Sequence, residues 1–335
     1  MDIKNLVAGK SYKVLVRCNT YNQSQYITTA LNGFAMQITD FPFICVVMDD
    51  CSTDGEQAIL EKYIIEECIV EEETKLEDEV AHVIIVPHKT NKHCIFVFYF
   101  LKENLYKHKE IKASYIKPWQ DVSKYEAFCE GDDYWIDHKK LQKQVEFLEA
   151  NPTIGMCYTK CRYFYQNQSK FAKKTWGGRA ERFEELIKNN TIPTPSVVYL
   201  AELRSKYDKD INPYSRGWML GDYPFWLWIS KEYGVKFIDE ETCVYRVLDH
   251  SASQRDNIER REAFISSVAE IQHFFADRYG QGYLVKKDKL ERALLMDSFS
   301  NKDYKRVIRC YQTIKKPGLK ATLKYLISLL LARRG

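Results

Sequence analysis

The chain has 335 residues, enough for one large domain or two with a sizeable core. Its hydrophobic content of 45% and its charged content of 29% are typical of a globular protein in water. There are 50 Lys and Arg residues and 46 Asp and Glu residues, and the net charge of +4 is too small for the basic footprint of a nucleic-acid-binding protein.

The ten cysteines show no repeated C-x-x-C spacing, which argues against a zinc site and against a disulfide framework. Cys18, Cys45 and Cys129 lie in apolar runs, where a reduced thiol behaves as a small hydrophobe. The N-terminal segment lacks the apolar stretch of a signal peptide, and no apolar run reaches the roughly 18 residues of a membrane span. We therefore expect a cytoplasmic location.

The first 160 residues alternate short apolar runs with segments of helical periodicity. Apolar strands between helices predict a mostly parallel sheet covered on both faces, hence an α/β fold. The expected strands cover 13–18, 43–48, 82–86, 125–130 and 154–159, and the expected helices cover 26–34, 59–64 and 139–150.

The pattern changes after residue 160. Residues 161–178 predict a long loop or an irregular hairpin, 182–190 a helix, and 191–200 a loop leading into a strand. A helix should begin near Asp222 and end at Gly234, followed by two short strands around an acidic turn in 235–247. From about residue 256 onward the periodicity is helical only.

Acidic residues follow two of the expected strands directly. Asp49 and Asp50 end one strand, while Glu130, Asp132 and Asp133 end another. Ligands of such sheets bind at the carboxyl ends of the strands, and clustered carboxylates suit Mg²⁺ or Mn²⁺ together with substrate phosphates. The alternatives are a solvated acidic turn at Glu130 and a capped helix start after Asp50.

Together, the segments VLVRCNTYNQSQYITTAL, FICVVMDDCSTDG and YEAFCEGDDYWIDHKKLQKQVEFLEANPTIGMCYT resemble the family 2 glycosyltransferases, which have the GT-A fold. The resemblance is dense over 13–159 and looser to about 253. It implies an inverting, metal-dependent transfer of a sugar from a nucleotide-diphosphate donor to an acceptor hydroxyl. It also implies a GT-A domain over 1–255, with a nucleotide-sugar half over about 10–160 and an acceptor half over 161–255, and a helical region over 256–335.

The resemblance assigns roles to individual residues. The Glu130-Gly131-Asp132 triplet matches the family's D-x-D metal motif, with Glu in place of the commoner first Asp. Asp132 and Glu130 are therefore the expected ligands of Mn²⁺ or Mg²⁺, with Asp133 and His250 as further candidates. The residues expected to bind the donor nucleotide are Thr20, Tyr21, Asn22, Asp49, Asp50, Glu130 and Gly131.

Asp222 matches the aspartate that acts as general base in the family, although Gly221 stands where many members have Glu. The alternative for Asp222 is a helix N-cap. Arg246, Lys92 and Trp119 are candidate contacts of the diphosphate or the acceptor, and an ion pair with an acid is the alternative for Arg246.

The implied donor is a UDP-sugar, or else a GDP-sugar, and the implied acceptor is a saccharide or lipid-linked saccharide in bacterial cell-surface polysaccharide synthesis. Rival hypotheses are a nucleotidyltransferase and a non-catalytic nucleotide- or sugar-binding module. Near the C-terminus, leucines at 319, 323, 326 and 330 share one helical face among lysines. That helix predicts either peripheral contact with the cytoplasmic face of the inner membrane or packing on the domain.

Overall fold

The structure, a computed structural model, describes residues 3–248 and 258–332. It divides into two compact units, which are described separately here. The first unit comprises Met1–Arg182, Thr191–Arg216 and Trp228–Asp249, and the second comprises Phe183–Asn190, Gly217–Leu227 and His250–Gly335. The predicted boundary near residue 255 stays a prediction.

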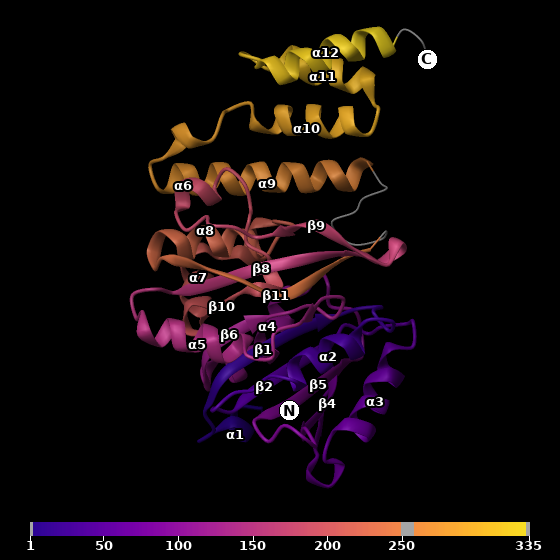
Figure 1. Cartoon of the computed structure of the whole chain (residues 1–335), viewed down its shortest axis with the longest axis vertical. Helices are drawn as coiled ribbons and strands as arrows, with labels where there is room; N and C mark the ends of the chain where they lie inside the picture. The colour runs from indigo at the N-terminus through magenta and orange to yellow at the C-terminus, as the bar shows by residue number, and fades with distance from the viewer. Residues whose placement is uncertain (1–2, 249–257, 333–335) are drawn as a thin grey trace. The chain divides into compact units, whose positions relative to one another are not determined.

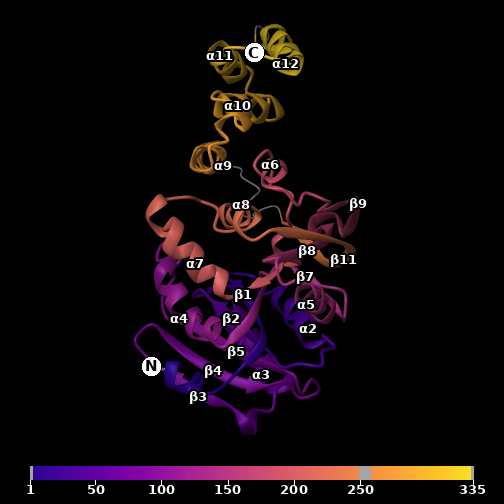
Figure 2. The ribbon, with the colours of Figure 1, turned by 90° about the vertical axis from the view of Figure 1, so that its left-hand side faces the viewer.

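The first unit is built on an 11-stranded sheet, shown edge-on in Figure 2 between α4 on one side and α2 and α5 on the other. The strand order is β3-β4-β5-β2-β1-β6-β10-β8-β11-β7, and β9 pairs with β8. The strands are β1 (Tyr12–Thr20), β2 (Phe43–Asp49), β3 (Thr74–Glu77), β4 (Ala81–Pro87), β5 (Cys94–Leu101), β6 (Ser123–Phe128), β7 (Tyr134–Trp135), β8 (Met156–Tyr165), β9 (Lys170–Trp176), β10 (Val198–Leu200) and β11 (Val235–Val247).

The helices are labelled in Figure 1. They are α1 (Ile3–Val7), α2 (Ile27–Ala35), α3 (Glu56–Glu67), α4 (Lys109–Asp121), α5 (Lys140–Ala150), α6 (Phe183–Leu186), α7 (Glu202–Ile211), α8 (Tyr223–Glu232), α9 (Ile258–Arg278), α10 (Lys289–Ser300), α11 (Tyr304–Thr313) and α12 (Leu319–Leu331). None of these described helices is both long and apolar enough to cross a lipid bilayer.

Strand β2 shows why the sheet is covered on both faces. All seven of its residues are buried. Because side chains alternate along a strand, Cys45 and Val47 face the core formed with α2, α3 and α5, while Val46 and Met48 face the core formed with α1 and α4. Strands β5, β2, β1 and β6 are mutually parallel, so their carboxyl ends share one edge of the sheet.

The order of the outer strands differs from the prediction. Residues 94–101, which were not predicted as a strand, form β5 next to β2. The predicted third parallel strand, 82–86, is β4, and it runs antiparallel to β5 outside it. Likewise, 235–247 forms one long strand with a register shift between Phe237 and Glu241 instead of two short strands.

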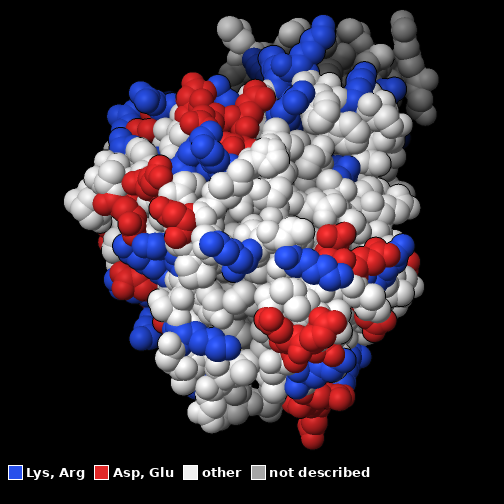
Figure 3. Space-filling model, turned by 60° about the horizontal axis from the view of Figure 1, so that its bottom comes forward, with Lys and Arg blue, Asp and Glu red and all other residues white. Residues whose placement is uncertain are grey.

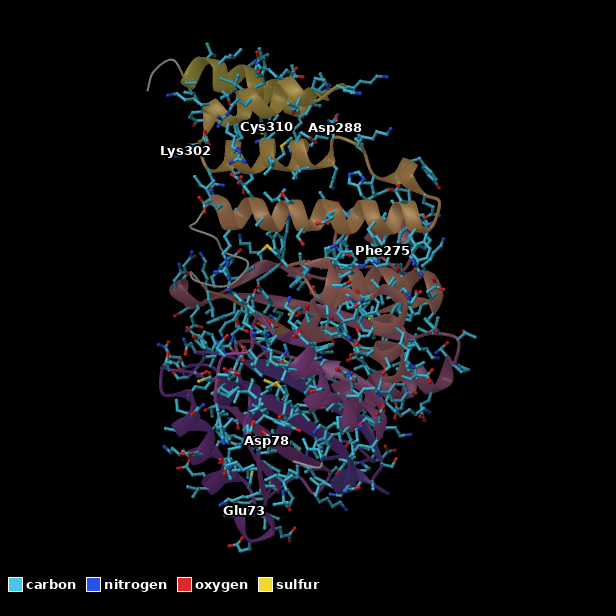
Figure 4. All side chains as sticks on the ribbon, turned by 180° about the vertical axis from the view of Figure 1, so that it is seen from behind. Glu73, Asp78, Phe275, Asp288, Lys302 and Cys310 are labelled. Carbon is cyan, nitrogen blue, oxygen red and sulfur yellow. The ribbon has the colours of Figure 1, made fainter. Side chains whose placement is uncertain are left out.

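In the second unit, helices α10, α11 and α12 enclose a small core of their own. Leu295, Val307, Ile314 and Ala321 are its buried members. Phe275 on α9 is also fully buried, and Figure 4 labels both Phe275 and Cys310, a residue of α11 that packs against the small core. The predicted helical character from about residue 256 onward is therefore confirmed within 258–332.

Candidate functional site

Three chain segments meet at the shared carboxyl edge of the parallel strands. Thr20 at the end of β1 lies beside Asp49 at the end of β2. The N–H of Asp50 donates to the Thr20 carbonyl (3.0 Å), and the N–H of Gly131, just after β6, donates to the Asn19 carbonyl (3.2 Å). The two acidic segments predicted to converge therefore flank the end of β1.

Gly131 is required by close approach to β1. A Cβ atom at this position would lie 2.5 Å from Thr20 Oγ1 and 2.9 Å from Thr20 Cβ, and closer still to the amide oxygen of Gln23. The φ angle of Gly131 lies outside the left-handed region, so the glycine is needed for its missing side chain and not for a sharp turn. This contact sets the metal motif against the Thr20 loop.

Glu56, the first residue of α3, was missed by sequence reasoning although it holds two of the loops together. Its buried carboxylate accepts the N–H of Gln23 (2.8 Å), the hydroxyl of Ser52 (2.9 Å) and the hydroxyl of Thr20. Burial raises the pKa of Glu56, and these hydrogen bonds partly offset the rise. A glutamate three residues after Thr53 fits a capping box, but nothing local indicated that it would be buried.

The loop after β1 is joined to the turn after β2 by Asn22. Its side-chain oxygen accepts the N–H of Thr53 (2.7 Å), and its own N–H donates to Ser52 Oγ (2.8 Å). Asn22 has a φ of 54°, an unusual conformation that these bonds hold in place. Tyr21, by contrast, is 46% exposed, so its ring faces solvent at the edge of the site.

Asp49 and Asp50 are both buried but have different partners. The carboxylate of Asp49 closes its own turn, accepting the N–H of Ser52 (3.3 Å) and the side-chain amide of Gln57 (2.6 Å). Asp50 forms an ion pair with Lys112 of α4 (2.8 Å) and accepts the N–H of Leu105 (2.7 Å). The predicted side-chain cap of α3 is wrong, because the N-cap residue is Gly55, which has no side chain; the N–H of Glu56 instead donates to Asp54 Oδ1 in the turn (3.1 Å).

The Glu130–Asp133 loop is anchored by Arg246 near the end of β11. The Arg246 N–H donates to Asp133 Oδ1 (2.8 Å), and its Nε donates to the Asp132 carbonyl (2.8 Å). The guanidinium lies over the rings of Tyr26 (5.0 Å to the centroid) and Tyr134 (4.7 Å). The cation that the sequence offered as a diphosphate contact is therefore enclosed by aromatic rings and holds the loop.

The electrostatics of this loop favour a cation. Burial raises the pKa of Asp132, and burial together with the charge of Asp132 raises the pKa of Asp133 well above its usual range. Glu130 is exposed beside them. Within the described residues no three His, Cys, Asp or Glu side chains form a metal cluster. Asp132 and Glu130 could supply one or two carboxylates to an ion that completes its shell with phosphate oxygens and water.

Two predicted contacts are corrected by the structure. Trp119 lies inside α4, is fully buried, and donates its indole N–H to the Tyr99 hydroxyl (2.7 Å), so it is a core residue. Lys92 lies in the turn that enters β5, and β5 starts beside the first residue of β2. Lys92 is thus exposed at the amino ends of the parallel strands, the edge opposite the acidic residues.

Asp222 belongs to the second unit. It is partly exposed immediately before α8, where its Oδ1 accepts the N–H of Tyr223 (2.6 Å) and its carbonyl accepts the N–H of Trp226 (3.0 Å). These contacts fit the helix-cap alternative, and the role as general base stays a prediction. His250, the further metal candidate, lies outside the described residues.

Comparison with known proteins bears on the same segments. Residues 19–89, which carry the loops after β1 and β2, match the model of "Glycosyl transferase family 2". Over these residues the chain is similar to glycosyl transferase family 2. The match agrees with the family resemblance inferred from the first two of the three sequence motifs.

Curated relatives match only parts of this chain. An uncharacterized protein of Mycobacterium tuberculosis is 31% identical over 183 residues, which is 54% of this chain and 44% of that protein. Poly(ribitol-phosphate) beta-N-acetylglucosaminyltransferase TarS of Staphylococcus aureus is 55% identical over 47 residues, 13% of this chain and 8% of TarS. The chain thus spans less than half the length of the curated relatives it matches.

A solved structure shares the fold. The mannosyltransferase PcManGT from Pyrobaculum calidifontis, in complex with GDP-Man and Mn2+, is 15% identical with a TM-score of 0.52, covering 97% of this chain and 81% of that one. The predicted fold class is therefore confirmed: a GT-A fold with a mostly parallel central sheet flanked by helices, followed by a helical C-terminal region.

Proposed function

We propose that the chain is a metal-dependent, inverting glycosyltransferase that moves a sugar from a UDP-sugar or a GDP-sugar to an acceptor hydroxyl. The observation that carries the proposal is the meeting of the loops after β1, β2 and β6 at one edge of the sheet, with acidic side chains on two of them. The relatives add support, since TarS is an N-acetylglucosaminyltransferase by name and PcManGT binds GDP-Man with Mn2+.

In this proposal the nucleotide lies along the loops of the first unit. Thr20, Tyr21 and Asn22 hold it from one side, and the Asp49–Asp50 pair binds the base and ribose from the other. Asp132, with Glu130 beside it, holds Mn²⁺ or Mg²⁺. When bound, such an ion neutralises negative charge on the departing diphosphate.

The chemistry is a single displacement at the anomeric carbon. The acceptor oxygen forms the new bond as the bond to the diphosphate oxygen breaks, and Asp222 takes the proton of the acceptor hydroxyl. Asp222 is partly exposed at a helix start, so an acceptor hydroxyl can approach its carboxylate.

The proposed setting is cell-surface polysaccharide synthesis, with a saccharide or lipid-linked saccharide as acceptor. We place the protein in the cytoplasm, in peripheral contact with the inner membrane. The proposed domain division keeps 1–255 as the glycosyltransferase domain and 256–335 as a helical region.

Thermal unfolding with UDP or GDP, each with and without Mn²⁺, tests donor binding. A nucleotide at about a hundred times its Kd should stabilise the protein by about 2.7 kcal/mol, and only when the metal is present. Asp132→Asn should remove this shift, whereas Asp121→Asn, at an exposed acid on α4, should keep it. Indifference to every nucleoside diphosphate contradicts the proposal, and a preference for triphosphates favours a nucleotidyltransferase.

The second arm of the test separates binding from chemistry. Asp222→Asn should keep the metal-dependent thermal shift and lower the rate of nucleotide diphosphate release in a donor and acceptor screen by about 10²-fold or more. Wild-type turnover in this variant refutes the base assignment. Nucleotide binding with no release by the wild-type chain, across donors and acceptors, favours the non-catalytic module.

A further inference from the structure

Positive charge is concentrated at the C-terminal end of the chain. From residue 304 to residue 335 there are nine Lys or Arg residues and no Asp or Glu. The first 303 residues then hold 41 basic and 46 acidic residues, a net charge of −5, although the whole chain carries +4. On the face shown in Figure 3, acidic and basic side chains are instead interspersed.

Helix α12 uses one of its faces to pack within the second unit. Ala321 and Ser328 are buried on this face. Tyr325 stacks on Tyr311 of α11 with ring centroids 4.1 Å apart, and the Tyr311 hydroxyl lies 3.0 Å from Thr322 Oγ1. This face of α12 therefore packs on α11.

The opposite face of α12 is apolar and exposed. Leu319 is 92% exposed, Leu323 60%, Leu326 51% and Leu330 69%. At 100° per residue these four side chains fall within one narrow stripe, roughly opposite Ala321 and Ser328. Four adjacent exposed leucines in one stripe are unusual for a water-exposed helix and mark a binding surface.

Cations border this leucine face. Lys315, Lys316 and Lys320 are exposed in the turn before α12 and in its first turn. Two other basic residues are engaged elsewhere: Lys324 lies 3.7 Å over the ring of Phe299, and Arg306 is paired with Glu262. A stripe of exposed leucines beside exposed lysines is complementary to a surface that is apolar below and anionic above.

We propose that the face of α12 formed by Leu319, Leu323, Leu326 and Leu330 docks on anionic lipid. The helix lies in the plane of the membrane surface, with its leucines in the acyl boundary and the three lysines among the headgroups. The inference rests on the second unit alone and does not depend on sugar transfer. The leucine face of α12 is then the surface through which the protein makes its proposed peripheral contact with the inner membrane.

Co-sedimentation of the full chain with vesicles tests the proposal. We expect binding to vesicles of equal parts phosphatidylglycerol and phosphatidylcholine, and at least about tenfold weaker binding to phosphatidylcholine alone. The double variant Leu323→Asp with Leu326→Asp should lose binding by about tenfold or more. Ile65→Asp is the matched control, because Ile65 is an aliphatic residue on α3 that is 65% exposed, and it should bind as the wild type does.

A charge variant and a measurement of oligomeric state complete the design. Lys315→Glu with Lys316→Glu and Lys320→Glu should weaken binding, and so should salt at about 1 M, where the screening length falls to about 3 Å. Equal binding to both vesicle types, or unchanged binding of the leucine variant, overturns the proposal. So does a wild-type oligomer in lipid-free buffer that the leucine variant dissociates, since the face would then join two copies. Circular dichroism melts identical to wild type confirm that each variant folds.

Discussion

At the scale of single residues, the candidate site depends on the absence of a side chain at residue 131. Gly131 lets the metal motif press against Thr20, whose hydroxyl is held in turn by Glu56. The position of the acidic loop is thus fixed by packing against the end of β1, and any side chain at residue 131 must displace either the loop or Thr20.

Gly131→Ala should therefore separate the metal motif from the Thr20 loop. We expect a loss of stability of about 1–3 kcal/mol from overpacking and the loss of the metal-dependent thermal shift with nucleotide. Gly178→Ala is the control, since a Cβ atom there meets nothing within 4 Å. Equal nucleotide shifts for both variants would show that the close approach at Thr20 has no bearing on binding.

The residues of the site were not equally predictable. Asp49, Asp50 and Glu130 could be found because acids that directly follow apolar strands stand out in the sequence. Glu56 could not, because its burial depends on Thr20, Gln23 and Ser52 from separate segments. Trp119 was misassigned because a tryptophan near charged residues gives no local sign of whether it faces the core.

At the scale of elements, helix α5 begins with a buried lysine. Lys140 is fully buried, donates to Gln144 Oε1 (2.7 Å) and lies 4.5 Å over the ring of Trp135. Burial lowers the pKa of Lys140 to about 8. The buried site therefore favours the neutral amine. At neutral pH Lys140 is still mostly protonated, and this lowers the free energy of unfolding by about 3 kcal/mol relative to a lysine with the usual pKa.

This depressed pKa predicts the sign of a pH effect. Between about pH 8 and the usual lysine pKa near 10.4, the unfolded chain binds more protons than the folded chain, so the contribution of Lys140 to stability rises with pH. Relative to Lys140→Met, the wild type should gain about 3 kcal/mol in unfolding free energy between pH 7 and pH 10.5, measured by urea denaturation. The difference between wild type and variant is compared at the two pH values, so the effect of the lost hydrogen bond, which is the same at both, cancels.

The control lies on the same helix. Lys143 is 40% exposed and paired with Asp137, and its pKa is raised instead of lowered, chiefly by that hydrogen bond. Relative to Lys143→Met, the wild type should show no such gain at high pH. If the two lysine variants respond alike, Lys140 is hydrated in solution and its pKa is not depressed.

Among the elements, the sheet centre was predicted and its outer strand order was not. Strands β1, β2 and β6 have nearly continuous apolar character, and the predicted runs match them closely. Strand β5 was overlooked because its aromatic run follows β4 after a short turn, and periodicity does not show which of two successive apolar strands pairs with β2. Lys92 was predicted from the family resemblance, and it lies in the turn that enters β5.

At the scale of the whole molecule, the candidate site residues are divided between two units. The nucleotide and metal candidates lie in the first unit, and Asp222 lies in the second. The second unit also carries the exposed leucine face of α12. The sequence showed the switch from an α/β pattern to a helical one, but it could not show that residues 183–190 and 217–227 join the second unit, because that depends on long-range packing.

Hydrogen exchange should show this division directly. UDP with Mn²⁺ should slow amide exchange in the loops after β1, β2 and β6, because a bound ligand makes local opening of the segments it contacts less favourable. Exchange in α10, α11 and α12 should be unchanged. Mn²⁺ alone serves as the control and should give little protection. Equal protection of α10–α12 would show that the two units open as one.

The hydrogen bond between Arg246 and Asp133 joins residues that are synthesised far apart in time. Asp133 and Arg246 are 113 residues apart in the chain, yet the bond between them fixes the Glu130–Asp133 loop. A nascent chain emerges from its N-terminus, so all the acidic strand ends leave the ribosome long before β11 does. During synthesis the sheet centre can form, with Gly131 packed on the end of β1, before Asp133 has its partner at residue 246. The bond between Asp133 and Arg246 should therefore form late, once residue 246 has emerged.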